Sequence, residues 1–135
     1  MDTYTLHQGT APLFISLPHN GTQVPDDIAA RLTPEARRVP DTDWHVAVWF
    51  HFARALGAPF VVRVFSRDVV SLNRPEDDVS LYPGQNTTGL CPIVRFSGDP
   101  VYLPGQDPAP DEIAARVDAY WRPYHQALQQ ELARV

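Results

Sequence analysis

The order of three apolar segments restricts the fold of this chain more than any other feature of its sequence. Leu13 to Leu17 has the length and composition of a short buried strand, and it ends at the turn signal Asn20-Gly21. Trp44 to Leu56 is apolar nearly all round and predicts a largely buried helix that stops at Gly57. Phe60 to Phe65 is rich in Val and Phe and predicts a second strand. A strand, a helix and a second strand in this order are how a parallel α/β sheet begins.

Shorter elements are expected around this unit. Ile28 to Leu32 predicts a short helix, and Val69 to Leu72 predicts a third, short strand. Pro110 to Val135 predicts a long terminal helix in which Pro123 introduces a kink. With no repeat and no linker, residues 1–135 are expected to form a single α/β domain.

Composition excludes several classes of function. The chain has 135 residues and a net charge of −5, and its 11 basic residues form no long run, so no surface for nucleic acid or an anionic membrane is expected. No segment approaches the roughly 18 apolar residues of a membrane span. The single cysteine, Cys91, cannot form an intrachain disulfide or a thiolate zinc site. We therefore expect a cytoplasmic protein that acts on a small molecule and would bind any metal through His, Asp or Glu.

His19 is the first candidate metal ligand. It follows the first predicted strand, and ligands of open α/β sheets bind at the carboxyl ends of the strands. Taken alone, it also fits a turn histidine bonded to local backbone. Asp41 and Asp43 precede the predicted helix and His45 lies at its start, and Asp43 could equally cap the helix. If residues 43 and 45 were both helical, their side chains would point about 200° apart, so at most one of them is a ligand. The histidines at positions 7, 51 and 125 are expected to pack or to lie on the surface.

A second candidate site follows the second strand. If strand alternation continues there, Arg67, Ser71 and Asn73 face one side and Arg74 emerges at the end. A planar guanidinium beside an amide suits a carboxylate, because two N–H groups match its two oxygens. An ion pair with a nearby acidic residue explains the arginines equally well.

Six segments occur in register along the chain: SLPHNGT, PDTDWHV, SRDVVSLNRP, SLYPGQNTTGLCP, FSGDPVY and YWRPYHQALQQEL. Together they resemble the amino-terminal half of the N-formylglutamate amidohydrolases, from about Pro12 to Val135. The resemblance implies zinc-dependent hydrolysis of the amide C–N bond of N-formyl-L-glutamate, giving formate and L-glutamate in histidine degradation. It also implies a three-layer α/β/α fold with a mostly parallel or mixed sheet, like that of zinc carboxypeptidases and aspartoacylases.

The same resemblance assigns metal ligands. It makes His19 a first zinc ligand and Asp43 the carboxylate ligand, with His45 and Asp41 as alternatives. The carboxylate position of the related carboxypeptidases is occupied here by Thr22.

For the substrate, the resemblance implies a carboxylate clamp of Arg67, Asn73 and Arg74. Ser71 stands where family members commonly have Asp. Gln85, Thr87 and Thr88 belong to a loop expected to lie near the substrate.

The resemblance places the third zinc ligand and the general base in sequence that follows Val135. We therefore expect residues 1–135 to be the amino-terminal half of a longer amidohydrolase domain, incomplete and inactive alone. Two alternatives stay open, an amidohydrolase for another N-acyl acidic amino acid and a non-catalytic module that binds dicarboxylates. The oligomeric state is also open.

Overall fold

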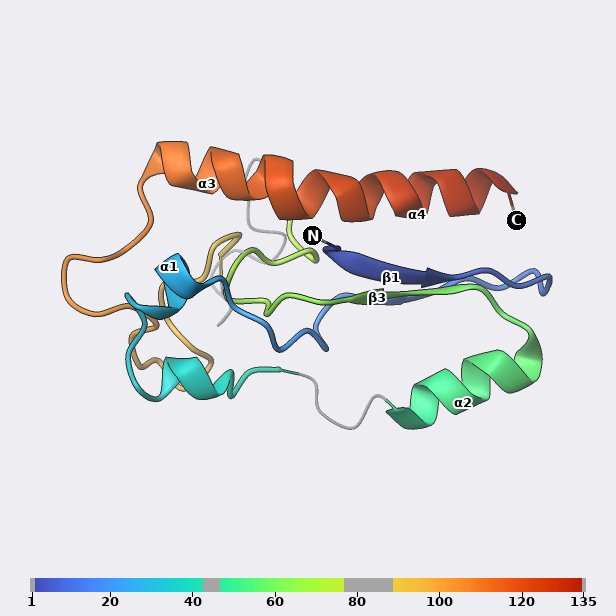
Figure 1. The fold of residues 1–135 in the computed structure, drawn as a ribbon, viewed down its shortest axis with the longest axis horizontal. Coiled ribbons are helices and arrows are strands. Elements are labelled where there is room, and N and C mark those ends of the chain that lie inside the picture. Colours follow the sequence, from blue (N-terminus) through green and yellow to red (C-terminus); the bar gives the residue numbers. More distant parts are fainter. Residues whose placement is uncertain (1, 43–46, 77–88, 135) are drawn as a thin grey trace.

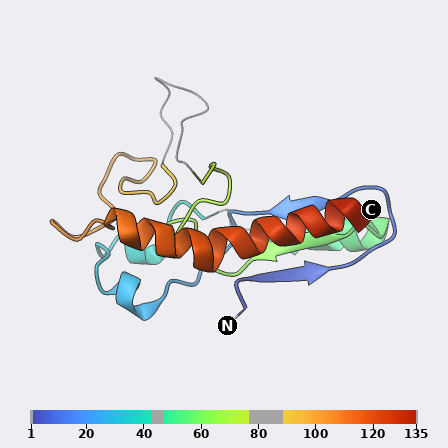
Figure 2. The ribbon, with the colours of Figure 1, turned by 90° about the horizontal axis from the view of Figure 1, so that it is seen from above.

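A three-stranded mixed sheet forms the centre of the computed structural model, which describes residues 2–42, 47–76 and 89–134 (Figure 1). Its strands are β1 (Tyr4–His7), β2 (Ile15–Leu17) and β3 (Phe60–Arg63), in the order β1-β3-β2. The central strand β3 is parallel to β2 and antiparallel to β1. Figure 2 shows β2 and β3 pointing one way and β1 the other. The two strands predicted from the apolar runs are thus confirmed, with shorter bounds.

Helices cover both faces of the sheet (Figure 1). On one face lies α2 (Ala47–Leu56), whose Ala53 packs against the β3 side chains Phe60 and Val62. On the other face, the long terminal helix packs against Val61 of β3. An α/β fold with a small mixed sheet between helices is therefore present.

The long terminal helix has three parts, α3 (Pro110–Arg116), a π-helical segment η2 (Val117–Trp121) and α4 (Arg122–Arg134). Within η2, the backbone N–H of Arg122 donates to the carbonyl of Val117, five residues back. Pro123 has no N–H to offer the carbonyl four residues before it, and the wider turn accommodates that loss. The interruption expected at Pro123 is therefore a π-helical segment that precedes it.

Two short helices precede α2, namely α1 (Asp26–Ala29) and η1 (Ala36–Arg38). They border a second apolar cluster, in which Ile28 and Leu32 pack with Phe65, Val69 and Tyr102. The helix predicted over Ile28 to Leu32 begins and ends earlier than expected. None of the described helices is long and apolar enough to cross a lipid bilayer.

The prediction of a strand at Val69 to Leu72 was wrong. This segment is buried but makes turns, because the Ser66 hydroxyl accepts the N–H of Asp68 at 3.1 Å and the Ser66 carbonyl accepts that of Val69 at 3.1 Å. Serine hydrogen bonds of this kind compete with a strand ladder. The third strand of the sheet is instead β1.

The helix α2 is less buried than its sequence predicted. Gly57 stops it with a φ of +66°, as expected. However, Phe52 and Leu56 are 54% and 48% exposed, because only one side of α2 meets the sheet. The part of the predicted helix at 44–46 lies outside the described residues.

A polar network joins the long helix to the rest of the fold. Glu112 of α3 binds Arg31 through two hydrogen bonds of 2.8 and 2.7 Å and also pairs with Arg116. Arg116 is 3% exposed and donates to the Tyr102 hydroxyl at 2.7 Å and to the Val69 carbonyl at 3.0 Å. Glu112 therefore neutralises a buried guanidinium that holds the turns after β3 in place.

We expect Glu112→Gln to lower the free energy of unfolding by about 2 kcal/mol, because it leaves the buried Arg116 without its carboxylate. The matched control is Asp118→Asn, which removes one of the two carboxylate partners of Arg122; the Asp118 and Arg122 side chains are 64% and 47% exposed. The control should cost less than about 0.5 kcal/mol. Urea unfolding of both variants measures the difference, and equal losses would contradict the role of Glu112.

Candidate active site

The carboxyl ends of β2 and β3 meet at one edge of the sheet, and the chain segments that follow them stay in contact. The N–H of Gln23 donates to the Val64 carbonyl at 3.2 Å, and the N–H of Ser66 donates to the Gln23 carbonyl at 2.7 Å. These bonds continue the parallel pairing past the ends of both strands. The loop that carries His19 is thereby held beside the segment that carries Arg67.

Gly21 allows this close contact. A Cβ atom at this position would lie 2.0 Å from the carbonyl oxygen of Phe65, so any side chain would push the two segments apart. The Gly21 carbonyl accepts a hydrogen bond from the Thr42 hydroxyl at 3.4 Å. The Asn20-Gly21 pair therefore does more than turn the chain, because it also brings Thr42 to the His19 loop.

His19 is half-buried, and its Nε2 atom has almost no exposed surface. The neighbouring Oδ1 of Asn20 is also buried, with no hydrogen-bond partner among the described residues. A buried acceptor without a donor is unusual and is the kind of group that a cation or an ordered water satisfies. Within the described ranges, no three His, Cys, Asp or Glu side chains gather closely enough to hold a metal ion. His19 is therefore the one imidazole among the predicted ligands that lies in the described ranges.

The structure does not test several of the predicted site residues and gives another contact to one of them. Asp43 and His45 lie outside the described residues, as do Gln85, Thr87 and Thr88. Asp41, the alternative ligand, is half-buried, and its Oδ2 accepts the N–H of Phe96 at 3.0 Å. Its carboxylate therefore anchors the segment around Phe96.

Arg67 is buried beside this segment, and its guanidinium carbon lies 4.4 Å from the centre of the Phe96 ring. An arginine that packs over an aromatic face can direct its N–H groups outward within the guanidinium plane, where they can meet a carboxylate. Phe96, which is bonded to Asp41, thus forms one wall around the Arg67 guanidinium.

Asp68 and Arg63 add buried charge that the sequence did not lead us to expect. Burial raises the pKa of Asp68 to about 6, and the charge of Asp41 acts in the same direction. The positive charges of Arg67, Arg63 and Arg95 oppose this rise. Burial also lowers the pKa of Arg63 to about 9. A charged residue within the apolar strand FVVR was the available signal for Arg63.

The predicted alternation of Arg67, Ser71 and Asn73 was wrong, because the segment is not a strand. Arg67 and Ser71 are buried, whereas Asn73 is exposed and Arg74 is half-buried. Arg74 donates to the carbonyl of Asn73 at 3.0 Å. Its own carbonyl accepts the indole N–H of Trp121 at 2.9 Å. Arg67 thus packs on Phe96, whereas the backbone of Arg74 is bonded to the long helix.

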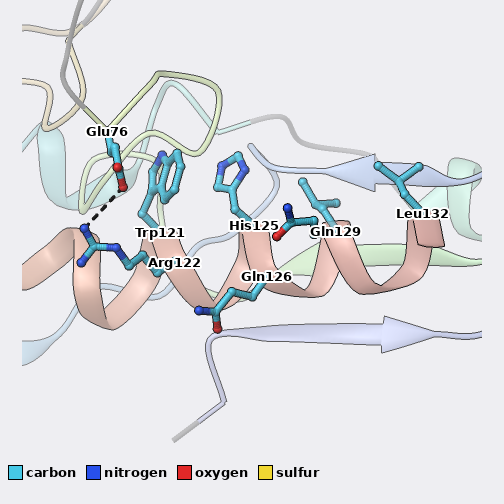
Figure 3. Close-up of a pocket in the computed structure, with 8 residues that line it drawn as sticks. Glu76, Trp121, Arg122, His125, Gln126, Gln129 and Leu132 are labelled. Carbon is cyan, nitrogen blue, oxygen red and sulfur yellow. Dashed lines mark hydrogen bonds and ion pairs between the residues drawn. The ribbon is translucent and has the colours of Figure 1, made fainter. Parts of the chain in front are cut away.

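A groove of about 430 Å³ runs along α4 and is drawn in Figure 3. Its described lining includes Glu76, Trp121, His125 and Leu132, but none of the residues that the sequence singled out as ligands or substrate contacts. The groove is therefore separate from the edge that carries His19 and Arg67.

Comparison with known proteins decides the family. The family model of N-formylglutamate amidohydrolase matches residues 11–135. The chain belongs to this family. It is 46% identical over 131 residues to the N-formylglutamate deformylase of Pseudomonas putida, covering 97% of this chain and 49% of that protein. It is 42% identical over 134 residues to the N-formylglutamate deformylase of Pseudomonas aeruginosa, covering 99% and 50%.

A solved structure supports the fold. The N-formylglutamate amidohydrolase of Ralstonia eutropha JMP134 superposes with a TM-score of 0.80 at 27% identity, over 98% of this chain and 52% of that one. The resemblance deduced from the six segments is confirmed. The chain spans about half the length of the curated relatives it matches.

The raised pKa of Asp68 predicts a pH-dependent stability. Its carboxyl ionises near pH 6 in the folded state and near 3.8 in the unfolded chain, so the folded state holds the extra proton between these values. Raising the pH from about 3.8 to about 6 therefore lowers the free energy of unfolding, by about 3 kcal/mol for two pKa units. Above about pH 6 this loss stays constant.

Asp68→Asn removes this cost, so its stability relative to the wild type should rise by up to about 3 kcal/mol from pH 4 to pH 7. Unfolding in denaturant, with chelator present, measures it, and Asp107→Asn at an exposed position is the control. A difference between Asp68→Asn and wild type that is independent of pH would contradict the buried carboxyl.

Proposed function

We propose that the protein hydrolyses N-formyl-L-glutamate to formate and L-glutamate with a zinc ion. The observation that carries the proposal is the joining of the His19 loop to the Ser66-Arg67 segment by backbone hydrogen bonds. The proposed metal ligand His19 and the proposed carboxylate-binding Arg67 belong to segments that meet at one sheet edge, which supports the proposal. The relatives named N-formylglutamate deformylase support N-formylglutamate as the substrate.

His19 and Asp43 are the proposed zinc ligands of this chain. The buried Oδ1 of Asn20, next to His19 in the sequence, supports a cation at this loop. The hydrogen bond from Thr42 to Gly21 supports Asp43, because Thr42 directly precedes it in the sequence. Zinc with an open coordination position polarises a carbonyl and lowers the pKa of bound water toward about 7, which is the chemistry that formamide hydrolysis needs.

The arginines are proposed to orient the substrate. N-Formylglutamate carries two carboxylates, and Arg67, Asn73 and Arg74 provide two guanidinium groups and an amide to bind them. The stacking of Arg67 on Phe96 limits its motion, so less side-chain entropy is lost when a carboxylate binds. Binding both carboxylates would direct the formyl group toward the metal. Gln85 and Thr88 stay proposed contacts of the same substrate.

The proposal also includes a role in histidine degradation and a cytoplasmic location. The family supports the first and the single buried Cys91 supports the second. We assign no general acid or base to a residue of this chain.

For zinc, we expect His19→Ala to weaken binding at least tenfold, since it removes an imidazole donor. Titration of the metal-free complete gene product with zinc, followed by calorimetry, measures the affinity. The control is His51→Ala, because His51 is exposed on α2. Equal zinc affinity in His19→Ala and wild type would exclude His19 as a ligand.

For the substrate, Arg67→Met should raise the KM for N-formylglutamate about 100-fold, because it removes a charge-assisted contact but keeps an apolar side chain on Phe96. Arg37→Met, at an exposed position of η1, is the matched control. Formate release at saturating zinc measures both. An unchanged KM would contradict the clamp, and faster turnover of N-acetylglutamate would favour another acyl group. Chelator-resistant binding of glutarate without any hydrolysis would favour a binding module.

A further inference from the structure

Two aromatic side chains of the long helix bind the backbone on either side of Asn73. The indole N–H of Trp121 donates to the Arg74 carbonyl at 2.9 Å, and Nε2 of His125 lies 2.8 Å from the Leu72 carbonyl. The two rings are stacked, with centres 3.8 Å apart and planes at 22°. Figure 3 shows both rings projecting from the helix in the same direction.

The chemistry of these contacts fixes the state of His125. A carbonyl oxygen only accepts, so Nε2 of His125 must carry a hydrogen. Burial lowers the pKa of His125, which favours the neutral ring, and the neutral Nε2–H tautomer makes this bond. Both donors of the pair are therefore used by main-chain carbonyls and are not available to a ligand in the groove that the rings line.

These hydrogen bonds take the place of the β-sheet hydrogen bonds that the segment lacks. A strand at this point would have satisfied the carbonyls of Leu72 and Arg74 through a neighbouring strand, but the segment makes turns instead. Asn73 lies exposed between the two bonded carbonyls. Leu72 is buried in the apolar cluster that Trp121 borders, whereas Asn73 and Arg74 extend beyond it, so the two hydrogen bonds add a constraint on the exposed part of the turn.

We propose that Trp121 and His125 are positioning residues that fix Asn73 and Arg74 for a substrate carboxylate. This inference rests on the proposed function, because it takes Asn73 and Arg74 as parts of the carboxylate clamp. Both rings act through backbone that they hold and do not touch the substrate.

The test compares glutarate binding by variants of the complete gene product, using calorimetry at constant ionic strength. Trp121→Phe keeps the stacked ring but removes the N–H donor, and His125→Phe does the same at the second position. We expect each to weaken glutarate binding about tenfold and to leave zinc affinity unchanged. His125→Gln, which restores an N–H donor, should recover part of the loss. Gln129→Ala, in the same groove, is the control and should bind like the wild type.

A double-variant cycle separates positioning from general damage to the fold. In an Arg74→Met background the clamp is already impaired, so adding Trp121→Phe should weaken glutarate binding less than twofold further. A full tenfold loss in both backgrounds, or an equal loss of zinc affinity, would overturn the positioning role. So would glutarate affinities of Trp121→Phe and His125→Phe that match the wild type.

Ligand binding by the wild-type protein separates failure of the proposed function from failure of the positioning role. If the wild-type protein binds neither glutarate nor N-formylglutamate, the proposed function fails, and the positioning role of Trp121 and His125 fails as well. If it binds them and Arg74→Met weakens the binding, while both ring variants bind normally, only the positioning role fails.

Discussion

The parallel pairing of β2 with β3 is the interaction on which the rest of the candidate site depends. It continues beyond both strands through Gln23, and the absence of a side chain at Gly21 lets the two backbones touch. Main-chain hydrogen bonds have fixed geometry, so they set the relation of His19 to Arg67 without help from long side chains. A site built in this way is rigid before any ligand arrives, which lowers the entropy lost on binding.

The sequence predicted the parts of the fold that local patterns control. The apolar runs before His19 and before Ser66 located β2 and β3, and Gly57 located the end of α2. It did not predict β1, because Tyr4–His7 alternates polar and apolar residues over only four positions and is stabilised by β3, far along the chain. The apparent strand at Val69 to Leu72 failed for the opposite reason, since Ser66 makes a local turn that an apolar pattern does not reveal.

In the candidate site too, the sequence predicted what local motifs carry and missed what tertiary contacts create. The motif order pointed to His19 and Arg67, and the structure joins their segments. The buried Asp68 and Arg63 could not be evaluated from the sequence, because a pKa depends on burial and on charges that tertiary structure brings near. His125 was expected to be a packing or surface residue, and its bond to the Leu72 carbonyl could not be inferred from helical spacing. Groups that act through tertiary neighbours are those that pattern analysis misses.

The π-helical segment η2 changes which parts of the fold the two halves of the long helix contact. One extra residue in a turn rotates everything that follows by about 100° relative to an uninterrupted α-helix. The helix presents Arg116 to the turns after β3 and, from the end of η2 onward, directs Trp121 and His125 to a later stretch of the same segment. Contacts with two stretches of one segment are thus combined on a single axis, so a one-residue deletion within η2 would rotate one set relative to the other and uncouple the two halves.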